Sequence, residues 1–247
     1  MATLLLRLAA PLQAWGIDSK FDIRRTGLEP SKSGVVGLLA AALGIGRDDL
    51  TALKPLCALR MGVRVDREGQ LLRDFHTVWG YKRGAGNRMT YDKETGRPVP
   101  AEKNTYVTNR YYLCDAVFLV GLEGDTPYLS MLEQALKHPA FPLFLGRRAC
   151  PPTLPLVLGI RDLPLETALD AEPWQGHIGK QPKQLRVRVE TPHGEAASVR
   201  VRDLPVSFDP RQRQFAYRGV SETYYRFNDE TTHDAMSELE GGDEPCI

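Results

Sequence analysis

The sequence has few cysteines, and they have no paired spacing. Cys57, Cys114, Cys150 and Cys246 lie far apart, with no CxxC pair among them. Disulfide frameworks and structural zinc sites both depend on patterned ligands, and disulfides also need an oxidising compartment. No pair of histidines has metal-ligand spacing either. We therefore expect a reduced, cytoplasmic protein without a metal site.

Long hydrophobic runs are also missing. The longest apolar stretch, Val35 to Ile45, is too short to cross a bilayer and contains glycines. The strand-like run Leu4 to Leu8 has no basic segment before it and no convincing cleavage site after it. We expect neither a transmembrane segment nor a signal peptide.

The common catalytic and cofactor motifs are absent. The chain contains no GxSxG elbow, no Walker P-loop and no HExxH. Gly44-Ile45-Gly46 lacks the third glycine and the helix spacing of a dinucleotide fingerprint. These absences predict no bound cofactor and argue against the usual enzyme classes.

Positive charge is absent from one end of the chain. After Arg226 there are seven acidic residues and no Lys or Arg, although the net charge of the whole chain is +1. The body is therefore basic, which favours a polyanionic partner. The acidic tail, residues 228–247, has the composition of a disordered segment.

What remains is a regular succession of predicted elements. Strands are predicted at Thr3 to Ala9, Cys57 to Val65, Ala116 to Leu122 and Leu154 to Ile160. The Cys57 to Val65 strand alternates, as in a half-buried strand. A helix is predicted from Val35, with Ser33 as its N-cap and Gly44 as its stop, and a second between Pro127 and Pro139. This β-α-β-β-α-β order predicts an α+β, ferredoxin-like domain.

A long insertion, residues 67–113, separates the second and third of these strands. Its strand-like flanks, 71–79 and 105–113, enclose a tip rich in Gly, Asn, Pro and Lys, which predicts a protruding β-ribbon. Between Arg73 and Tyr112, bases outnumber acids by eight to four, with aromatic side chains interleaved. Cations pair with phosphates and aromatic faces stack on unpaired bases, so the mixture suits single-stranded RNA. The alternative is a solvated hairpin whose tyrosines pack on the body. The predicted RNA-binding residues of the insertion are His76, Lys82, Arg83, Arg88 and Tyr106.

A second basic surface is predicted where the first strand ends. Pro11-Leu12-Gln13-Ala14-Trp15-Gly16 is followed by Arg24, Arg25, Lys32 and Ser33. Trp15 suits stacking on a base, Gln13 suits reading a base edge, and the amides at the helix start suit a phosphate. Two alternatives stay open: Trp15 is a core anchor, and Ser33 is only a cap.

Adjacent arginines mark a third stretch, Leu145-Gly146-Arg147-Arg148-Ala149-Cys150-Pro151. Two guanidinium groups in a loop flanked by Gly and Pro suit the clamping of neighbouring phosphates. Arginine pairs are common on protein surfaces, so this motif alone does not decide a function.

The same stretches resemble the CRISPR-associated protein family five. The run from Leu5 to Gly16 is similar to the family's opening, and Pro30-Ser31-Lys32-Ser33-Gly34-Val35-Val36-Gly37-Leu38-Leu39 is similar to its first helix entry. Asp74-Phe75-His76-Thr77-Val78 and the arginine loop are similar to type I-E members. The four motifs occur in the family's order over about residues 1–160.

This resemblance implies an RNA-recognition-type fold of the RAMP superfamily with a thumb hairpin. The implied domains are 1–162, interrupted by a thumb at 67–113, and a small C-terminal β region at 163–227. The implied function is to hold the 5′ handle of CRISPR RNA (crRNA) in a Cascade ribonucleoprotein complex for antiviral defence, capping a filament of backbone subunits. The implied partners are the backbone subunit, the large target-recognition subunit and target DNA held by the whole complex.

The competing hypothesis is a metal-independent endoribonuclease that processes CRISPR precursor RNA, as relatives in type I-C complexes do. Such cleavage needs a base for the 2′-hydroxyl and an acid for the leaving oxygen. Of the five histidines, only His138 adjoins a lysine, Lys137, at the end of the second predicted helix. His76 is the residue on which a site would be built, and a lone strand histidine is more often structural. We therefore expect a binding protein rather than an enzyme; a pure protein scaffold without RNA contact is the third possibility.

Overall fold

The computed structural model describes residues 1–16, 19–20, 22–81, 91–92, 94–97, 103–153, 155–176, 181–192, 199–209 and 211–226. Lys82, Arg83 and Arg88, together with the acidic tail at 228–247, lie outside the described residues. None of the helices within the described ranges is long and apolar enough to cross a membrane.

The body is built on one seven-stranded antiparallel sheet in the order β11-β12-β10-β5-β8-β1-β9. The strands are β1 (Ala2–Ala9), β5 (Arg60–Arg67), β8 (Val117–Gly124), β9 (Val157–Arg161), β10 (Gln184–Glu190), β11 (Val199–Ser207) and β12 (Gln214–Arg226). Because β10 pairs with β5, the C-terminal strands continue the sheet that the N-terminal strands begin. The protein is thus a mixed α+β fold with antiparallel sheets.

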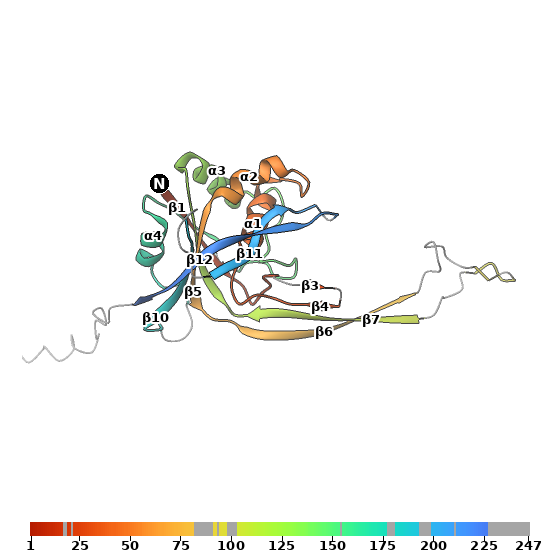
Figure 1. The fold of residues 1–247 in the computed structure, drawn as a ribbon. Coiled ribbons are helices and arrows are strands. Elements are labelled where there is room, and N and C mark those ends of the chain that lie inside the picture. Colours follow the sequence, from red (N-terminus) through yellow and green to blue (C-terminus); the bar gives the residue numbers. More distant parts are fainter. Residues whose placement is uncertain are drawn as a thin grey trace, which may run out of the picture.

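Helices cover both faces of this sheet (Figure 1). Three helices, α1 (Lys32–Leu43), α2 (Leu50–Ala58) and α3 (Thr126–Lys137), pack with Leu4, Leu6 and Leu8 in the larger apolar core. The short helix α4 (Leu165–Ala171) packs with Leu5 in a second core on the other face. All eight residues of β1 are therefore buried, as the continuous apolar run of this strand favours.

The predicted strand from Cys57 was wrong at its start and in its exposure. Cys57 and Ala58 end α2, a helix that Asp49 caps by accepting from the Ala52 amide. The strand β5 follows and is buried on both faces rather than one. Its second face is covered because Gly62 lies under Leu165 and Leu169 of α4. The alternation of polar residues had suggested a solvent-facing side.

The N-cap of the first helix lies two residues before the predicted one. Ser31, not Ser33, is the N-cap of α1, and its hydroxyl accepts a hydrogen bond from the Gly34 amide at 3.2 Å. The predicted stop is confirmed, because Gly44 caps the C-terminus in the left-handed conformation at φ 75°. The helix predicted between Pro127 and Pro139 is confirmed as α3.

A long antiparallel ribbon extends away from the body (Figure 1). The predicted flanking strands are present as β6 (Gln70–Tyr81) and β7 (Lys103–Cys114), which pair from Gln70 with Cys114 to Tyr81 with Lys103. Three short strands complete this second sheet at the base of the ribbon: β2 (Leu12–Gln13), β3 (Ser19–Lys20) and β4 (Ile23–Arg24). The segments after β1 and the ribbon are thereby one structural unit.

Candidate nucleic-acid interface

Two of the sequence motifs, the opening run and the first helix entry, meet at the indole of Trp15. Its backbone amide donates to the Thr26 hydroxyl at 2.8 Å, and its carbonyl accepts from the Gly27 amide. Its ring packs so closely on the start of α1 that a Cβ at Gly34 would lie 2.8 Å from a ring carbon. Trp15 is only 1% exposed. The core-anchor alternative therefore describes its role in this structure.

Gln13 is equally enclosed. Its side-chain amide donates to the Leu8 carbonyl at 3.1 Å and the Ala116 carbonyl at 2.7 Å, and its oxygen accepts from the Trp15 indole nitrogen at 3.1 Å. Both polar ends of the buried side chain are satisfied inside the protein. The predictions that Gln13 reads a base edge and Trp15 stacks on a base are corrected, because neither side chain reaches the surface.

The N-terminus of α1 is occupied by the chain's own carboxylates. The Lys32 amide donates to Asp203 Oδ2 at 2.7 Å, and the Lys32 ammonium lies 2.8 and 2.7 Å from the two Glu190 carboxylate oxygens. Arg218 holds the other oxygen of Asp203 at 2.7 Å. Burial lowers the pKa of Lys32, and the charge of Glu190 partly opposes this. The predicted phosphate contact of Lys32 is therefore corrected: the side chain is 2% exposed and already paired.

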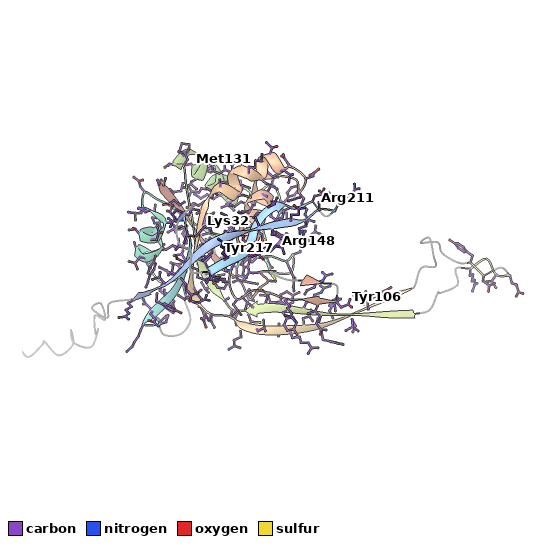
Figure 2. The ribbon with its side chains drawn as sticks, in the orientation of Figure 1. Lys32, Tyr106, Met131, Arg148, Arg211 and Tyr217 are labelled. Carbon is purple, nitrogen blue, oxygen red and sulfur yellow. The ribbon has the colours of Figure 1, made fainter. Side chains whose placement is uncertain are left out.

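The two adjacent arginines of the arginine loop, Arg147 and Arg148, have different environments. Arg147 donates to the Tyr111 carbonyl at 3.1 Å and the Arg24 carbonyl at 2.9 Å, and its guanidinium lies 4.7 Å from the centre of the Tyr112 ring. Arg147 thus holds the arginine loop against β7 and β4, and its guanidinium is occupied by protein groups. Arg148, the next residue, is exposed (Figure 2). The two-arginine clamp stays a prediction, with Arg147 half-buried and held by protein groups and Arg148 exposed in this structure.

Strand pairing brings three predicted residues to one face of the ribbon. Arg110 of β7 is paired with Arg24 on one side and with Asp74 on the other, and His76 and Tyr106 follow at alternate positions of β6 and β7. Alternate residues of paired strands share a face. Tyr106 is 50% exposed, and the His76 side chain is 43% exposed. This face therefore retains part of the cation and aromatic chemistry of the sequence prediction, and Arg25 and Arg148 are exposed elsewhere on the surface.

The His76 side chain is partly exposed, and its interaction with the nearby Asp74 carboxylate is weak. Its Nδ1 lies 3.9 Å from Asp74 Oδ2, beyond hydrogen-bond distance. Within the described ranges, no three His, Cys, Asp or Glu side chains cluster as metal ligands would. His76 therefore has no described neighbour placed to take or give a proton at short range.

The opposite face of the ribbon carries exposed apolar side chains on either side of the hydrogen-bonded pair Arg73–Asn109. Leu71 and Phe75 of β6 are 58% and 60% exposed, and Ile23 and Val107 beside them are 45% and 37% exposed. At the base of the ribbon, a hollow of about 290 Å³ is lined by Arg25, Thr26, Leu71 and Tyr111. An exposed apolar stripe on an extended ribbon is typical of a protein contact.

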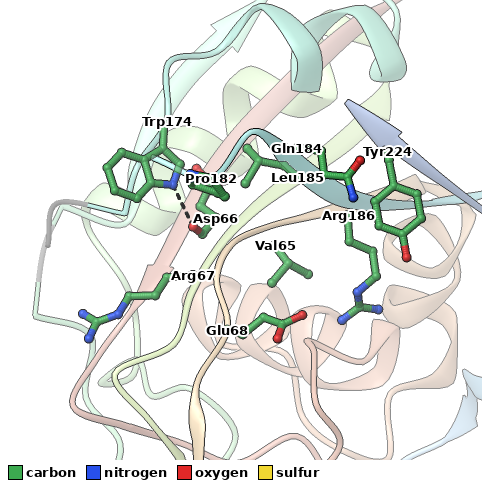
Figure 3. Close-up of a pocket in the computed structure, with 10 residues that line it drawn as sticks. All are labelled: Val65, Asp66, Arg67, Glu68, Trp174, Pro182, Gln184, Leu185, Arg186 and Tyr224. Atoms are coloured by element: carbon green, nitrogen blue, oxygen red, sulfur yellow. Dashed lines mark hydrogen bonds between the residues drawn. The ribbon is translucent and has the colours of Figure 1, made fainter. Parts of the chain in front are cut away.

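A second hollow lies at the end of β5, away from the motifs (Figure 3). It has a volume of about 430 Å³, and Trp174, Arg67, Glu68, Arg186 and Tyr224 are among its lining residues. The Trp174 indole donates to the Asp66 carbonyl at 2.7 Å. Arg186 is already paired with Glu29 at 2.9 Å, and Glu68 adds a negative charge to the rim. The charges of the lining offset one another, so this hollow does not favour a polyanion.

The C-terminal strands carry basic residues that the sequence analysis did not single out. Exposed arginines follow one another at 200, 202, 211 and 213, and Tyr217 among them is 63% exposed. The alternation of Arg with apolar residues from 199 onwards was the available signal, but periodicity gives no indication of which face is outward.

Comparison with known proteins places the chain in a family. The sequence profile described as CRISPR-associated protein (Cas_Cas5) matches residues 3–221. The chain therefore belongs to the CRISPR-associated protein family five, and the resemblance seen in the four motifs is confirmed.

Individual relatives are similar over most of their length. The chain is 36% identical to the CRISPR system Cascade subunit CasD of Escherichia coli (strain K12) over 223 residues, which cover 85% of this chain and 91% of that protein. A solved structure titled CRISPR RNA-guided surveillance complex contains a chain with a TM-score of 0.73 and 34% identity, covering 91% of this chain and 90% of that one. Another, titled Crystal structure of Cas protein, has a TM-score of 0.67 and 41% identity, covering 91% and 95%.

Proposed function

We propose that this chain is the crRNA-binding subunit of a type I-E Cascade surveillance complex, which holds the 5′ handle of the crRNA and caps the backbone filament. The observation that carries this proposal is the likeness to CasD over 85% of the chain, together with the CRISPR RNA-guided surveillance complex among its structural relatives. The four motifs lie in β1 and the loop after it, at the start of α1, within β6 and in the arginine loop.

We infer a ferredoxin-like, RRM-type core from the strand order. The four strands β5-β8-β1-β9 lie side by side, with α1 on the connection after β1 and α3 on the connection after β8. This is the arrangement that a β-α-β-β-α-β chain adopts when its two helices cover one face. The ribbon of β6 and β7 would then be the thumb, inserted at 67–113 in a domain spanning 1–162. The region 163–227 adds its strands to the same sheet.

The proposed RNA contacts are those predicted residues that the fold leaves on the surface. Arg24, Arg25 and Arg148 would meet phosphates, while His76 and Tyr106 on the ribbon would meet unpaired bases. Lys82, Arg83 and Arg88 lie outside the described residues, and their RNA contacts stay predictions, as does that of half-buried Ser33. Gln13, Trp15 and Lys32 are buried and support the surface from within, and Arg147 holds the arginine loop in place.

The apolar ribbon face fits a protein neighbour. Ile23, Leu71, Phe75 and Val107 would lie against the adjacent backbone subunit, because burial of these exposed side chains favours association. The large target-recognition subunit and target DNA remain proposed partners of the assembled complex.

Titration of the purified chain with a labelled 5′-handle RNA tests the proposal. The variant Arg24→Glu/Arg25→Glu/Arg148→Glu should weaken binding at least tenfold and reduce the salt dependence of log affinity by about 0.7 for each phosphate that is no longer bound. Lys137→Glu is the matched control, because Lys137 lies on α3 and pairs with Glu133 on the surface. Equal weakening in both proteins, or none in either, would reject the proposed surface.

The same reaction, with precursor repeat RNA and without divalent metal, tests the endoribonuclease alternative. A binding subunit leaves the repeat intact. Cleavage at one position that His76→Ala abolishes would replace the binding proposal, since His76 is the residue on which that chemistry would depend.

A further inference from the structure

The β11–β12 hairpin presents an outward surface of arginines. Its exposed cations are Arg200, Arg202, Arg211 and Arg213, and Tyr217 beside them is 63% exposed. The stretch 199–218 has no lysine, and its two acids are Asp203 and Asp209. Among the described residues, none forms an ion pair with Arg200, Arg211 or Arg213.

Both acidic residues of the hairpin accept hydrogen bonds from groups of the protein itself. Asp203 is 7% exposed and is bound by Arg218 and the Lys32 amide. Asp209 accepts from the Arg211 amide at 2.8 Å in the turn. The outward charge is therefore positive, because Arg218 neutralises Asp203 and the four exposed arginines outnumber Asp209.

The hairpin is fixed at its base. The Asp203–Arg218 pair ties β11 to β12, and the bond from the Lys32 amide ties both to the first turn of α1. The Cys57 thiol also points at the Pro205 carbonyl, at 3.5 Å. Because these contacts fix the backbone of the hairpin, less conformational entropy is lost when its exposed side chains bind a ligand.

We propose that the outer face of this hairpin, through Arg202, Arg211, Arg213 and Tyr217, binds an unpaired nucleic-acid strand. Guanidinium groups bind phosphates in bidentate fashion, and an exposed tyrosine offers a face for stacking a base. In Figure 1 the free end of the hairpin projects from the body toward the same side as the ribbon, and Figure 2 shows Arg211 at that end. The inference rests on the proposed function, since it adds a second contact for the same class of ligand.

The strand has two possible sources in a guide-bearing complex, the guide RNA or a DNA strand of the target. The test therefore titrates the full chain with two labelled probes, a 5′-handle RNA and an unstructured single-stranded DNA. Arg211→Glu/Arg213→Glu should weaken binding of at least one probe about tenfold or more and lower its salt slope by about 1.4. Tyr217→Ala should weaken the same probe about tenfold. The probe whose affinity falls further identifies the source.

Lys137→Glu serves as the control, and thermal melting confirms that each variant is folded. If the hairpin variants bind both probes as wild type does, the inference is overturned, while weaker binding by Arg24→Glu/Arg25→Glu/Arg148→Glu would still support the proposed function. Conversely, weaker binding confined to the hairpin variants supports the hairpin and rejects the ribbon surface. Unchanged binding of both probes with failure to assemble into the complex would assign the arginines to an acidic protein and also overturn the inference.

Discussion

Gly146 lies directly against the backbone of Ala14, so that a Cβ at position 146 would be 1.7 Å from the Ala14 carbonyl oxygen. The Ala14 amide in turn donates to the Leu145 carbonyl at 3.1 Å. Two motifs about 130 residues apart in the sequence are thus joined backbone to backbone. A glycine is required at position 146 for two reasons: a Cβ would clash with Ala14, and the φ of 88° is a conformation that other residues rarely adopt.

Gly146→Ala should therefore destabilise the protein by about 3 kcal/mol or prevent its folding, through backbone strain and displacement of the arginine loop. Chemical denaturation monitored by circular dichroism measures the change. Gly16→Ala is the matched control, because a Cβ at Gly16 meets nothing within 4 Å. Similar stability of the two variants would contradict the assigned contact.

Arg147 and Arg148 should separate stability from RNA affinity. Arg147→Ala removes three hydrogen bonds to carbonyls and the contact with the Tyr112 ring, and should cost about 2 kcal/mol, or about 4–8 °C in Tm. Arg147→Lys should recover only part of this, because an ammonium lacks the planar fork. Arg148→Ala should leave Tm within about 1 °C of wild type. An equal fall in Tm at both positions would reject the different roles.

The buried Arg64–Asp66 pair should be a large contributor to the stability of the loop at 172–176. Arg64 is 1% exposed and Asp66 2% exposed; Arg64 also donates to the Leu169, Glu172 and Pro173 carbonyls. Asp66→Ala leaves that guanidinium buried without its carboxylate and should cost about 3–5 kcal/mol.

Trp174 provides a local probe of the same change. Its neighbour Gln175 donates its amide to Asp66 Oδ2 at 2.7 Å, so Asp66→Ala should alter Trp174 fluorescence before global unfolding. Glu133→Ala, which removes only the surface pair with Lys137, should cost about 0.5 kcal/mol or less. A comparable cost in the two variants would show that the buried pair is replaceable.

Tyr225 should make the protein sensitive to alkaline pH. Burial, with the nearby charges of Asp170 and Glu166, raises the pKa of Tyr225 to about 12, and its hydroxyl donates to the Glu166 carbonyl at 3.1 Å. Below the ordinary pKa of 10.0, both folded and unfolded states keep the proton, so the stabilisation is fully present. Between pH 10 and 12 only the unfolded state releases it, so stability falls.

Tyr225→Phe should consequently melt about 3 °C lower at pH 8, because it lacks the hydrogen bond, yet its Tm should fall less than that of wild type as the pH rises from 10 to 12. Tyr217→Phe, at a position 63% exposed, is the control and should follow the wild-type curve. Parallel curves for Tyr225→Phe and wild type would exclude Tyr225 as the cause.

The sequence by itself determined the elements whose signals are local. The continuous apolar run of β1, the helical period of α1 with its stop at Gly44, and the prolines around α3 each act within a few residues. The two strands at the flanks of the insertion, β6 and β7, were also predicted from local signals. Helix α2 was missed because Pro55 lies inside it and because its last residues continue the alternation of β5.

Only the tertiary structure decided which site residues reach solvent. Lys32 and Arg147 have the chemistry of RNA contacts, yet each is held by groups distant in sequence. For Lys32 those groups are Glu190 and Asp203, 158 and 171 residues away. A charged side chain is buried only where a partner offsets the loss of hydration, and the partner is supplied by the fold. The sequence pattern therefore indicated the region of the proposed RNA-binding surface, and tertiary packing determined which of its residues are exposed.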